Sequence, residues 1–134
     1  MDVAGLKQIP LFAALSKKDL RAAAHLADEI HVNKGARLAE EGQFAHEFFV
    51  IKDGTAEVVH DGNVIAQLGP GDFFGEIALL ITRRRTASVV ARTPMKLVVI
   101  FGPNFKTLNA QMPNVKEKID AAIEARCAGL EVAR

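Results

Sequence analysis

Two residues of opposite charge, Glu76 and Arg85, flank a short apolar stretch in the segment FGEIALLITRRRTASVV, which runs from residue 74 to residue 90. A guanidinium can hold a phosphate through two parallel hydrogen bonds. A carboxylate repels a phosphate but accepts a hydrogen bond from a sugar hydroxyl. A ligand with a phosphate and a free hydroxyl on one ribose would use both groups. The pattern therefore predicts a nucleotide site in which Glu76 and Arg85 bind opposite ends of the ligand.

The residues beside these two charges supply further hydrogen-bond donors. Gly75 has no side chain, so a ligand can approach the backbone there. The segment EIALL is expected to form a short helix, whose first N–H groups lack partners within the helix and attract an anion. The hydroxyls of Thr86 and Ser88 and the N–H of Ala87 follow the arginines. The segment thus carries donors on both sides of its apolar stretch.

A mainly β fold is expected to position these groups. From Ile30 onward, short apolar runs alternate with Gly-containing turns, and Asp53-Gly54 and Asp61-Gly62 are strong turn signals. Two further strands, TASVVAR and KLVVIF, follow the arginines. The pattern predicts about eight short strands in a small antiparallel β-roll of the jelly-roll kind.

Helices are expected on either side of the roll. Ser16 is a predicted N-cap, with Asp19 three residues later, and apolar residues up to Ala27 fall on one face. A short helix is expected in PNFKTLNAQM, and a longer one opens at Pro113, a favourable first-turn residue. The longer helix is predicted to present one stripe, formed by Val115, Ile119, Ala122, Ile123 and Arg126.

The domain boundaries follow from these elements. We expect one domain over residues 1–134, with an N-terminal helical part at about 1–28. The β-roll is expected at about 29–101 and the C-terminal helices at about 103–130. A chain of this length suits one domain with a real core.

Composition narrows the function classes. About half of the residues are apolar and the formal net charge is +1, which argues against a general nucleic-acid or membrane-surface binder. Cys127 is the only cysteine, so no disulfide can form within the chain, which fits a reducing, cytoplasmic compartment. No apolar run approaches the length needed to span a bilayer.

The stretch FGEIALL followed by RTASV resembles the phosphate-binding cassette of the cyclic nucleotide-binding domain family. IPLFAALSKKDL, EEGQFAHEFFVIKDGTAEVV and LGPGDFFGE resemble the entry helix and roll turns of the same family, so the resemblance covers nearly the whole chain. The family includes the catabolite activator protein, protein kinase A regulatory subunits and cyclic nucleotide-gated channels. RRTASV is most similar to the channel branch.

The resemblance implies a role for each matching residue. Glu76 would accept a hydrogen bond from the ribose 2′-OH, and Arg85 would bind the cyclic phosphate. Backbone groups nearby would donate to the phosphate and ribose, and Thr86 would add a hydroxyl. The candidate ligand-binding residues are Phe74, Gly75, Glu76, Ile77, Ala78, Arg85, Thr86, Ala87 and Arg126.

Two departures from the family pattern stand out. Many relatives carry a glycine before the arginine region, where this chain has Ile81 and Thr82, so a stiffer loop is expected. Many relatives close the site with an aromatic residue from the last helix, but this chain has no Trp or Tyr and no Phe after Phe105. A cap over the base would then come from aliphatic groups or from an arginine such as Arg126.

Each candidate also has a simpler interpretation. Arg83 and Arg84 are expected to be no more than a solvated basic pair. Glu76 could be a helix N-terminal carboxylate that the dipole favours. Thr86 could be an ordinary strand residue, and Arg126 a solvated helix arginine.

Four histidines raise the alternative of a cupin-type metalloenzyme. Such a metal site needs several converging ligands, usually two His close in sequence, a carboxylate and a distant His. Here His46 stands alone and no His follows His60. A transcription factor would need a helix-turn-helix after the last helix, and the sequence ends at Arg134, so no DNA binding is expected of this chain alone. A degenerate roll that binds only protein is disfavoured by Glu76 and Arg85.

The sequence therefore predicts a sensor module without catalytic residues that binds a 3′,5′-cyclic nucleotide, cAMP rather than cGMP. A cGMP-preferring or cyclic dinucleotide-binding module stays open, because the Thr86 hydroxyl could meet the amino group of a guanine. The ligand would favour a state in which the last helix packs over the site. The output would pass to a fused domain or to a separate partner protein.

Overall fold

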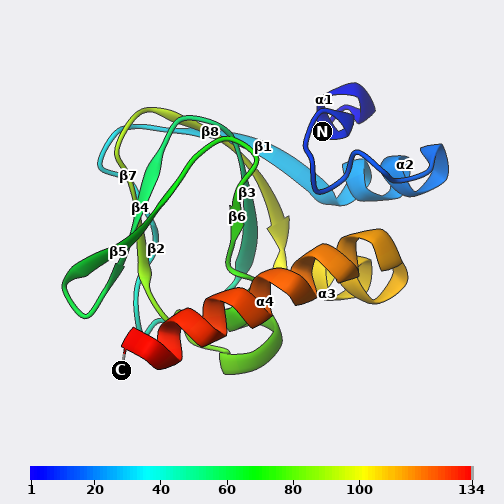
Figure 1. Cartoon of the computed structure of the whole chain (residues 1–134). Helices are drawn as coiled ribbons and strands as arrows, with labels where there is room; N and C mark the ends of the chain where they lie inside the picture. The colour runs from blue at the N-terminus through cyan, green and yellow to red at the C-terminus, as the bar shows by residue number, and fades with distance from the viewer. Residues whose placement is uncertain (134) are drawn as a thin grey trace.

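The computed structural model describes residues 1–133 and the side chains of residues 1–127. Within that range the chain forms eight strands in two antiparallel four-stranded sheets, with helices before and after them (Figure 1). The predicted mainly β architecture with flanking helices is confirmed. The first sheet has the order β1-β8-β3-β6 and the second the order β2-β7-β4-β5.

The centre of the first sheet is buried on both faces, whereas its edge strand Ala27–Val32 is largely exposed. Its strands are β1 (Ala27–Val32), β3 (Glu47–Asp53), β6 (Phe73–Phe74) and β8 (Met95–Phe101). Alternate side chains of a strand point to opposite faces. Phe49 and Ile51 face the interior of the roll, whereas Phe48 and Val50 face the helices. The four-residue apolar run in β3 therefore reflects two buried faces.

The second sheet consists of β2 (Arg37–Ala39), β4 (Ala56–His60), β5 (Asn63–Leu68) and β7 (Ser88–Ala91). Its interior side chains meet those of the first sheet in one cluster. β5 is an edge strand, and all but its last residue are exposed.

The two predicted turns serve different purposes. Asp61 and Gly62 have φ values of 51° and 79° and join β4 to β5 as a two-residue hairpin turn, the geometry that Asp-Gly favours. Gly54 connects strands of different sheets. A Cβ there would stand 2.4 Å from the carbonyl oxygen of Pro94, so only glycine fits.

The N-terminal part contains α1 (Val3–Lys7) and α2 (Lys17–Leu26). The Ser16 hydroxyl accepts a hydrogen bond from the Asp19 N–H at 3.1 Å, as expected of the N-cap. Leu20, Ala23 and Ala24 form the buried face. The helix ends earlier than the apolar pattern indicated, because Ala27 is the first residue of β1.

The C-terminal part contains α3 (Gly102–Gln111) and α4 (Pro113–Ala133), close to the predicted boundaries. Between β6 and β7 lies η1 (Ala78–Thr82), a π-helical turn that continues the helical backbone of Glu76 and Ile77. Figure 1 shows α4 running from α3 toward the η1 side of the roll. These elements bring the cassette residues and the last helix together.

Candidate functional site

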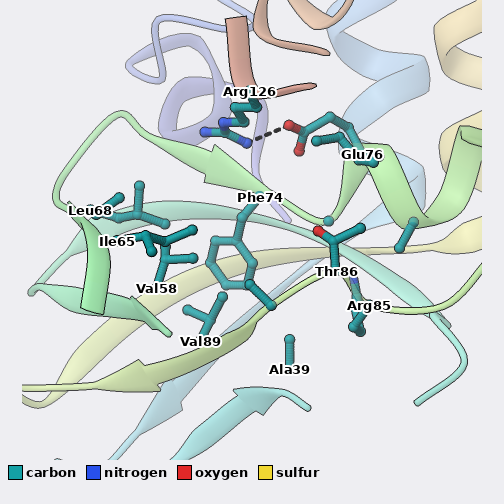
Figure 2. Close-up of a pocket in the computed structure, with 15 residues that line it drawn as sticks. Ala39, Val58, Ile65, Leu68, Phe74, Glu76, Arg85, Thr86, Val89 and Arg126 are labelled. Atoms are coloured by element: carbon teal, nitrogen blue, oxygen red, sulfur yellow. Dashed lines mark hydrogen bonds and ion pairs between the residues drawn. The ribbon is translucent and has the colours of Figure 1, made fainter. Parts of the chain in front are cut away.

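A cavity of about 270 Å³ lies between the second sheet, β6 and the segment that begins at Gly75. Its volume is near the lower end of the range for small-molecule sites, which begins at about 300 Å³. Figure 2 shows its side chains, with the charged groups of Glu76 and Arg126 on one side and apolar groups of the roll on the other. All nine predicted ligand-binding residues line it. The lining comprises Ala39, Val58, Ile65, Ala66, Leu68, Phe74, Gly75, Glu76, Ile77, Ala78, Arg85, Thr86, Ala87, Val89 and Arg126.

Glu76 is a buried carboxylate, with only 1% of the residue exposed. Its Oε1 accepts a hydrogen bond from Nη1 of Arg126, and the same contact is an ion pair. Its Oε2 is buried and has no hydrogen-bond partner among the described residues. A buried carboxylate oxygen without a donor is costly. A hydroxyl donor in the cavity would relieve that cost.

Arg85 is the second buried charge of the cavity, at 7% exposed. Its Nη2 donates to the backbone carbonyl oxygen of Glu47 at 2.7 Å. Its Nη1 is buried and has no acceptor among the described residues. Burial lowers the pKa of the Arg85 guanidinium from its usual value, whereas the nearby carboxylates of Glu47 and Glu76 oppose that shift. The group remains a cation and has one nitrogen free for an anion.

Gly75 makes the approach of Arg85 sterically possible. Its φ of 101° lies in a region that side chains rarely adopt. A Cβ at this position would stand 2.6 Å from Nη1 of Arg85 and 3.0 Å from the carbonyl oxygen of Glu47. Any side chain would therefore displace the nitrogen that is free to bind an anion.

The three consecutive arginines take three different positions. Only Arg85 enters the cavity. Arg84 is exposed; its guanidinium lies 4.1 Å from the ring centroid of Phe44, and its Nη1 donates to the carbonyl oxygen of Gly42 at 2.8 Å. Arg84 thus stays exposed and outside the cavity, and its guanidinium fastens the cassette to the loop that contains Gly42 and Phe44.

Arg83 lies in the exposed loop between η1 and β7. Its φ is 67°, in the left-handed region that is uncommon for residues other than glycine. Two backbone hydrogen bonds fix this loop. The N–H of Gly42 donates to the carbonyl oxygen of Arg85 at 2.9 Å, and the N–H of Ala45 donates to the carbonyl oxygen of Arg83 at 2.9 Å. The backbone bonds thus hold a conformation that the side chain at position 83 disfavours.

The predicted stripe on α4 divides into two parts. Val115 and Ile119 are fully buried in the core cluster that contains the N-terminal helices and α3, so they do not cover the cavity. Arg126 does reach it: Nη2 donates to the carbonyl oxygen of Phe73 at 2.6 Å, and Nη1 pairs with Glu76. The interpretation of Arg126 as a solvated helix arginine is therefore wrong, since two-thirds of its side chain is covered.

The apolar wall of the cavity was missed by the sequence reasoning. Side chains from β2, β4, β5 and β7 form it, including Ala39, Val58, Ile65, Leu68 and Val89. Ile65 is 44% exposed although it is a large apolar residue. Consecutive apolar residues in a short strand beside a hairpin turn were the available signal. They indicated a strand but not the cavity.

Phe74 has a double role. Its ring is buried and stacks on Phe49 at 4.8 Å between centroids, and it also forms part of the cavity lining. Figure 2 shows this ring in the middle of the apolar side chains. It packs the roll beneath the site and offers the ligand only carbon.

The described residues lack a metal cluster and a membrane-spanning helix. No group of three or more His, Cys, Asp and Glu side chains comes together so that it could hold a metal ion. No helix in the described part of the chain combines the length and hydrophobicity needed to cross a membrane.

Comparisons with known proteins agree with this geometry. The model of the cyclic nucleotide-binding domain family matches residues 29–111. A cAMP-dependent protein kinase regulatory subunit of Schizosaccharomyces pombe is 34% identical over 104 residues, which are 77% of this chain and 25% of that protein. The chain thus spans only a quarter of the length of this curated relative.

Solved structures share the fold, and two of them illustrate the similarity. A cAMP-bound PfPKA-R chain superimposes with a TM-score of 0.86 at 24% identity, over 98% of this chain and 45% of that chain. The catabolite activator protein of Thermus thermophilus has a TM-score of 0.77 at 25% identity, over 92% of this chain and 61% of that chain.

Proposed function

Since the chain belongs to the cyclic nucleotide-binding domain family, we propose that it binds a 3′,5′-cyclic nucleotide, with cAMP preferred, and acts as a sensor without catalysis of its own. One observation carries this proposal. Glu76 and Arg85 are buried charges of opposite sign on one cavity, and each keeps one polar atom without a partner among the described residues. A cyclic nucleotide offers a hydroxyl to one atom and an anion to the other.

The phosphate is assigned to the Arg85 side of the cavity. Nη1 of Arg85 would donate to a phosphate oxygen, and the attraction would be strong because the site excludes most water. Gly75 and Ala87 lie beside this position and would add backbone donors. Burial without a bound anion is unfavourable for a guanidinium, so a phosphate would remove an existing cost.

The ribose is assigned to Glu76. Its Oε2 would accept the hydrogen of the 2′-OH, while Oε1 stays with Arg126 or exchanges that partner. A phosphate at this carboxylate would be repelled. The two charges therefore orient the ligand as well as hold it.

The base is assigned to the apolar wall of β4, β5 and β7. Its carbon-rich lining, with Val58, Leu68 and Val89, favours a flat aromatic ring through burial of apolar area. Thr86 is a polar side chain of the lining whose hydroxyl could contact the amino group of guanine and so select that nucleobase. The relative that is 34% identical over 104 residues is named as a cAMP-dependent protein kinase regulatory subunit, which supports cAMP.

The proposed output is a movement of the C-terminal half of α4. Arg126 links that helix to Glu76 and to the backbone of Phe73. A ligand that competes for Glu76 would change how strongly the helix is held, and so would shift the population of helix positions. A fused domain or a partner protein would read the shift.

Calorimetric titration of the chain with cAMP, cGMP and a cyclic dinucleotide tests the proposal. We expect saturable one-to-one binding of cAMP, weaker binding of cGMP and none of the dinucleotide, which exceeds the cavity. No heat of binding with either mononucleotide would refute the proposed function. Tighter binding of cGMP than of cAMP would refute only the assignment of the base.

A further inference from the structure

The imidazole of His60, the last residue of β4, contacts the backbone of the cassette from outside the cavity. Its Nδ1 lies 2.8 Å from the carbonyl oxygen of Thr86. A carbonyl oxygen can only accept a hydrogen bond, so Nδ1 carries the hydrogen and donates it. Thr86 lines the cavity and His60 does not.

Glu41 lies beside the ring of His60. Its Oε1 lies 3.5 Å from Nδ1 of His60 and accepts a hydrogen bond from the Asp61 N–H at 3.0 Å. The N–H of Glu41 donates to the hydroxyl of Ser88 at 2.9 Å. These bonds connect the loop at Glu41, the turn after β4 and the start of β7 around one imidazole.

The carbonyl that His60 contacts shares a peptide plane with the N–H of Ala87. The described residues contain no cis peptide bond, and in a planar trans peptide the C=O and the N–H point in opposite directions. A donor that fixes the Thr86 carbonyl therefore also fixes the direction of the Ala87 N–H. Ala87 has only a methyl side chain, which cannot orient its own backbone.

We propose that His60 is a positioning residue for the ligand phosphate, because its Nδ1–H fixes the Thr86–Ala87 peptide so that the Ala87 N–H is presented to the cavity. This inference rests on the proposed cyclic nucleotide site. It adds a residue that does not touch the ligand and acts through one peptide plane.

Replacing His60 by asparagine or by glutamine distinguishes a positioning role from general packing, because the two side-chain amides differ in length. The nitrogen of an asparagine side chain is bonded to Cγ, as Nδ1 of histidine is, whereas the glutamine nitrogen lies one bond further out. His60→Asn can therefore keep the donor in place. His60→Gln keeps polarity but shifts the donor, and His60→Leu removes it. His31, an exposed residue of β1 outside the cavity, provides the control variant His31→Leu.

Titration with cAMP should sort these variants by donor position. His60→Leu and His60→Gln should weaken binding by about fivefold to tenfold, the usual effect of losing one hydrogen bond. His60→Asn and His31→Leu should stay within about twofold of the original chain. Equal affinities for His60→Leu and His60→Asn, in folded proteins, would overturn the inference.

The two cyclic phosphorothioate diastereomers of cAMP test whether His60 acts on the phosphate. Each replaces one exocyclic oxygen by sulfur, a weaker acceptor. The loss of affinity caused by His60→Leu should be smaller for the diastereomer whose sulfur faces Ala87 and should stay the same for the other diastereomer. The same loss with cAMP and both diastereomers would show that His60 only stabilises the fold.

Carbon-13 and nitrogen-15 NMR of the ligand-free protein separates this inference from the proposed function. The Thr86 carbonyl and Ala87 nitrogen shifts should change in His60→Leu and remain near their original values in His60→Asn. Unchanged shifts in His60→Leu would overturn the inference whatever the chain binds. An original chain that bound no cyclic nucleotide would overturn the proposed function and, with it, any role of His60 toward a phosphate.

Discussion

Arg126 of α4 pairs with Glu76, the carboxylate to which we assign the ribose, in the structure without ligand. The pair joins two segments that are 50 residues apart in the chain. It covers one carboxylate oxygen and leaves the other without a partner among the described residues. The helix that would report ligand binding is therefore already attached to the ligand-binding group.

Replacing Arg85 should affect binding far more than replacing Arg83, which lies outside the cavity. Arg85→Ala should weaken cAMP by about thirtyfold or more, because losing one partner of a desolvated charge pair costs about 2–5 kcal/mol. Arg83→Ala, at the exposed loop tip, should change the affinity by less than about threefold. Calorimetry provides both values, and circular dichroism verifies folding. Equal losses would show that Arg85 is not the phosphate ligand.

Replacing Glu76 should have an effect that depends on the sugar. Glu76→Gln should weaken cAMP by about tenfold, because a charged acceptor for the 2′-OH is lost. The same variant should hardly change the affinity for 2′-deoxy-cAMP, which lacks that hydroxyl. Competition binding with both nucleotides measures the two ratios. If the affinities for both ligands fall by the same factor, Glu76 supports the loop and does not bind the sugar.

Replacing Arg126 should destabilise the ligand-free domain. Arg126→Gln leaves the buried Glu76 carboxylate without its cation, and we expect a loss of about 1–2 kcal/mol in the free energy of unfolding, less than for a fully buried pair because Arg126 is partly exposed. Urea unfolding provides the value. Lys116→Gln, which removes an exposed ion pair with Asp120 on the same helix, should cost less than about 0.5 kcal/mol. Similar losses would mean that the Glu76 pair is no stronger than a surface pair.

The two halves of α4 should respond differently to ligand. Val115 and Ile119 are fixed in the core, so their amide NMR signals should shift little when cAMP is added. The signals from Arg126 onward should shift or broaden, because the contact with Glu76 changes. Uniform small shifts along the whole helix at saturating cAMP would argue against the proposed movement.

Adding one methyl group at Gly75 should disturb both stability and binding. Gly75→Ala places a Cβ 2.6 Å from Nη1 of Arg85 at a φ of 101°, and we expect a destabilisation of about 2–4 kcal/mol. Gly35→Ala is the matched control, since its φ is 91° but nothing lies within 4 Å of the added Cβ. Gly35→Ala should lower the free energy of unfolding by about 1–2 kcal/mol and leave the cAMP affinity unchanged. Thermal unfolding and calorimetry of both variants would reveal whether the close contact matters.

Local signals in the sequence predicted the fold well. The Ser16 cap and the Asp61-Gly62 hairpin turn depend on residues close together in the chain, and both are confirmed. The family resemblance is also confirmed. The roles assigned to Glu76 and Arg85 remain predictions, although the structure brings both residues to one cavity.

Contacts between distant segments were harder to predict. Helical spacing placed Val115 and Ile119 on one face, but spacing alone does not say which neighbour covers that face. The helices cover it, not a ligand. Likewise, nothing local indicated that Arg84 would stack on Phe44 or that Arg126 would reach Glu76.

The 2.6 Å approach between a Cβ at position 75 and Nη1 of Arg85 also constrains how this site can evolve. A lineage that first replaced Gly75 would push the guanidinium aside while the protein still depended on it. A lineage that first shortened Arg85 would remove this obstruction, and a side chain at position 75 would then meet only the backbone strain and the carbonyl oxygen of Glu47, 3.0 Å away. Loss of the anion site is therefore the easier first step, and its reversal requires the glycine to return before the arginine can work again.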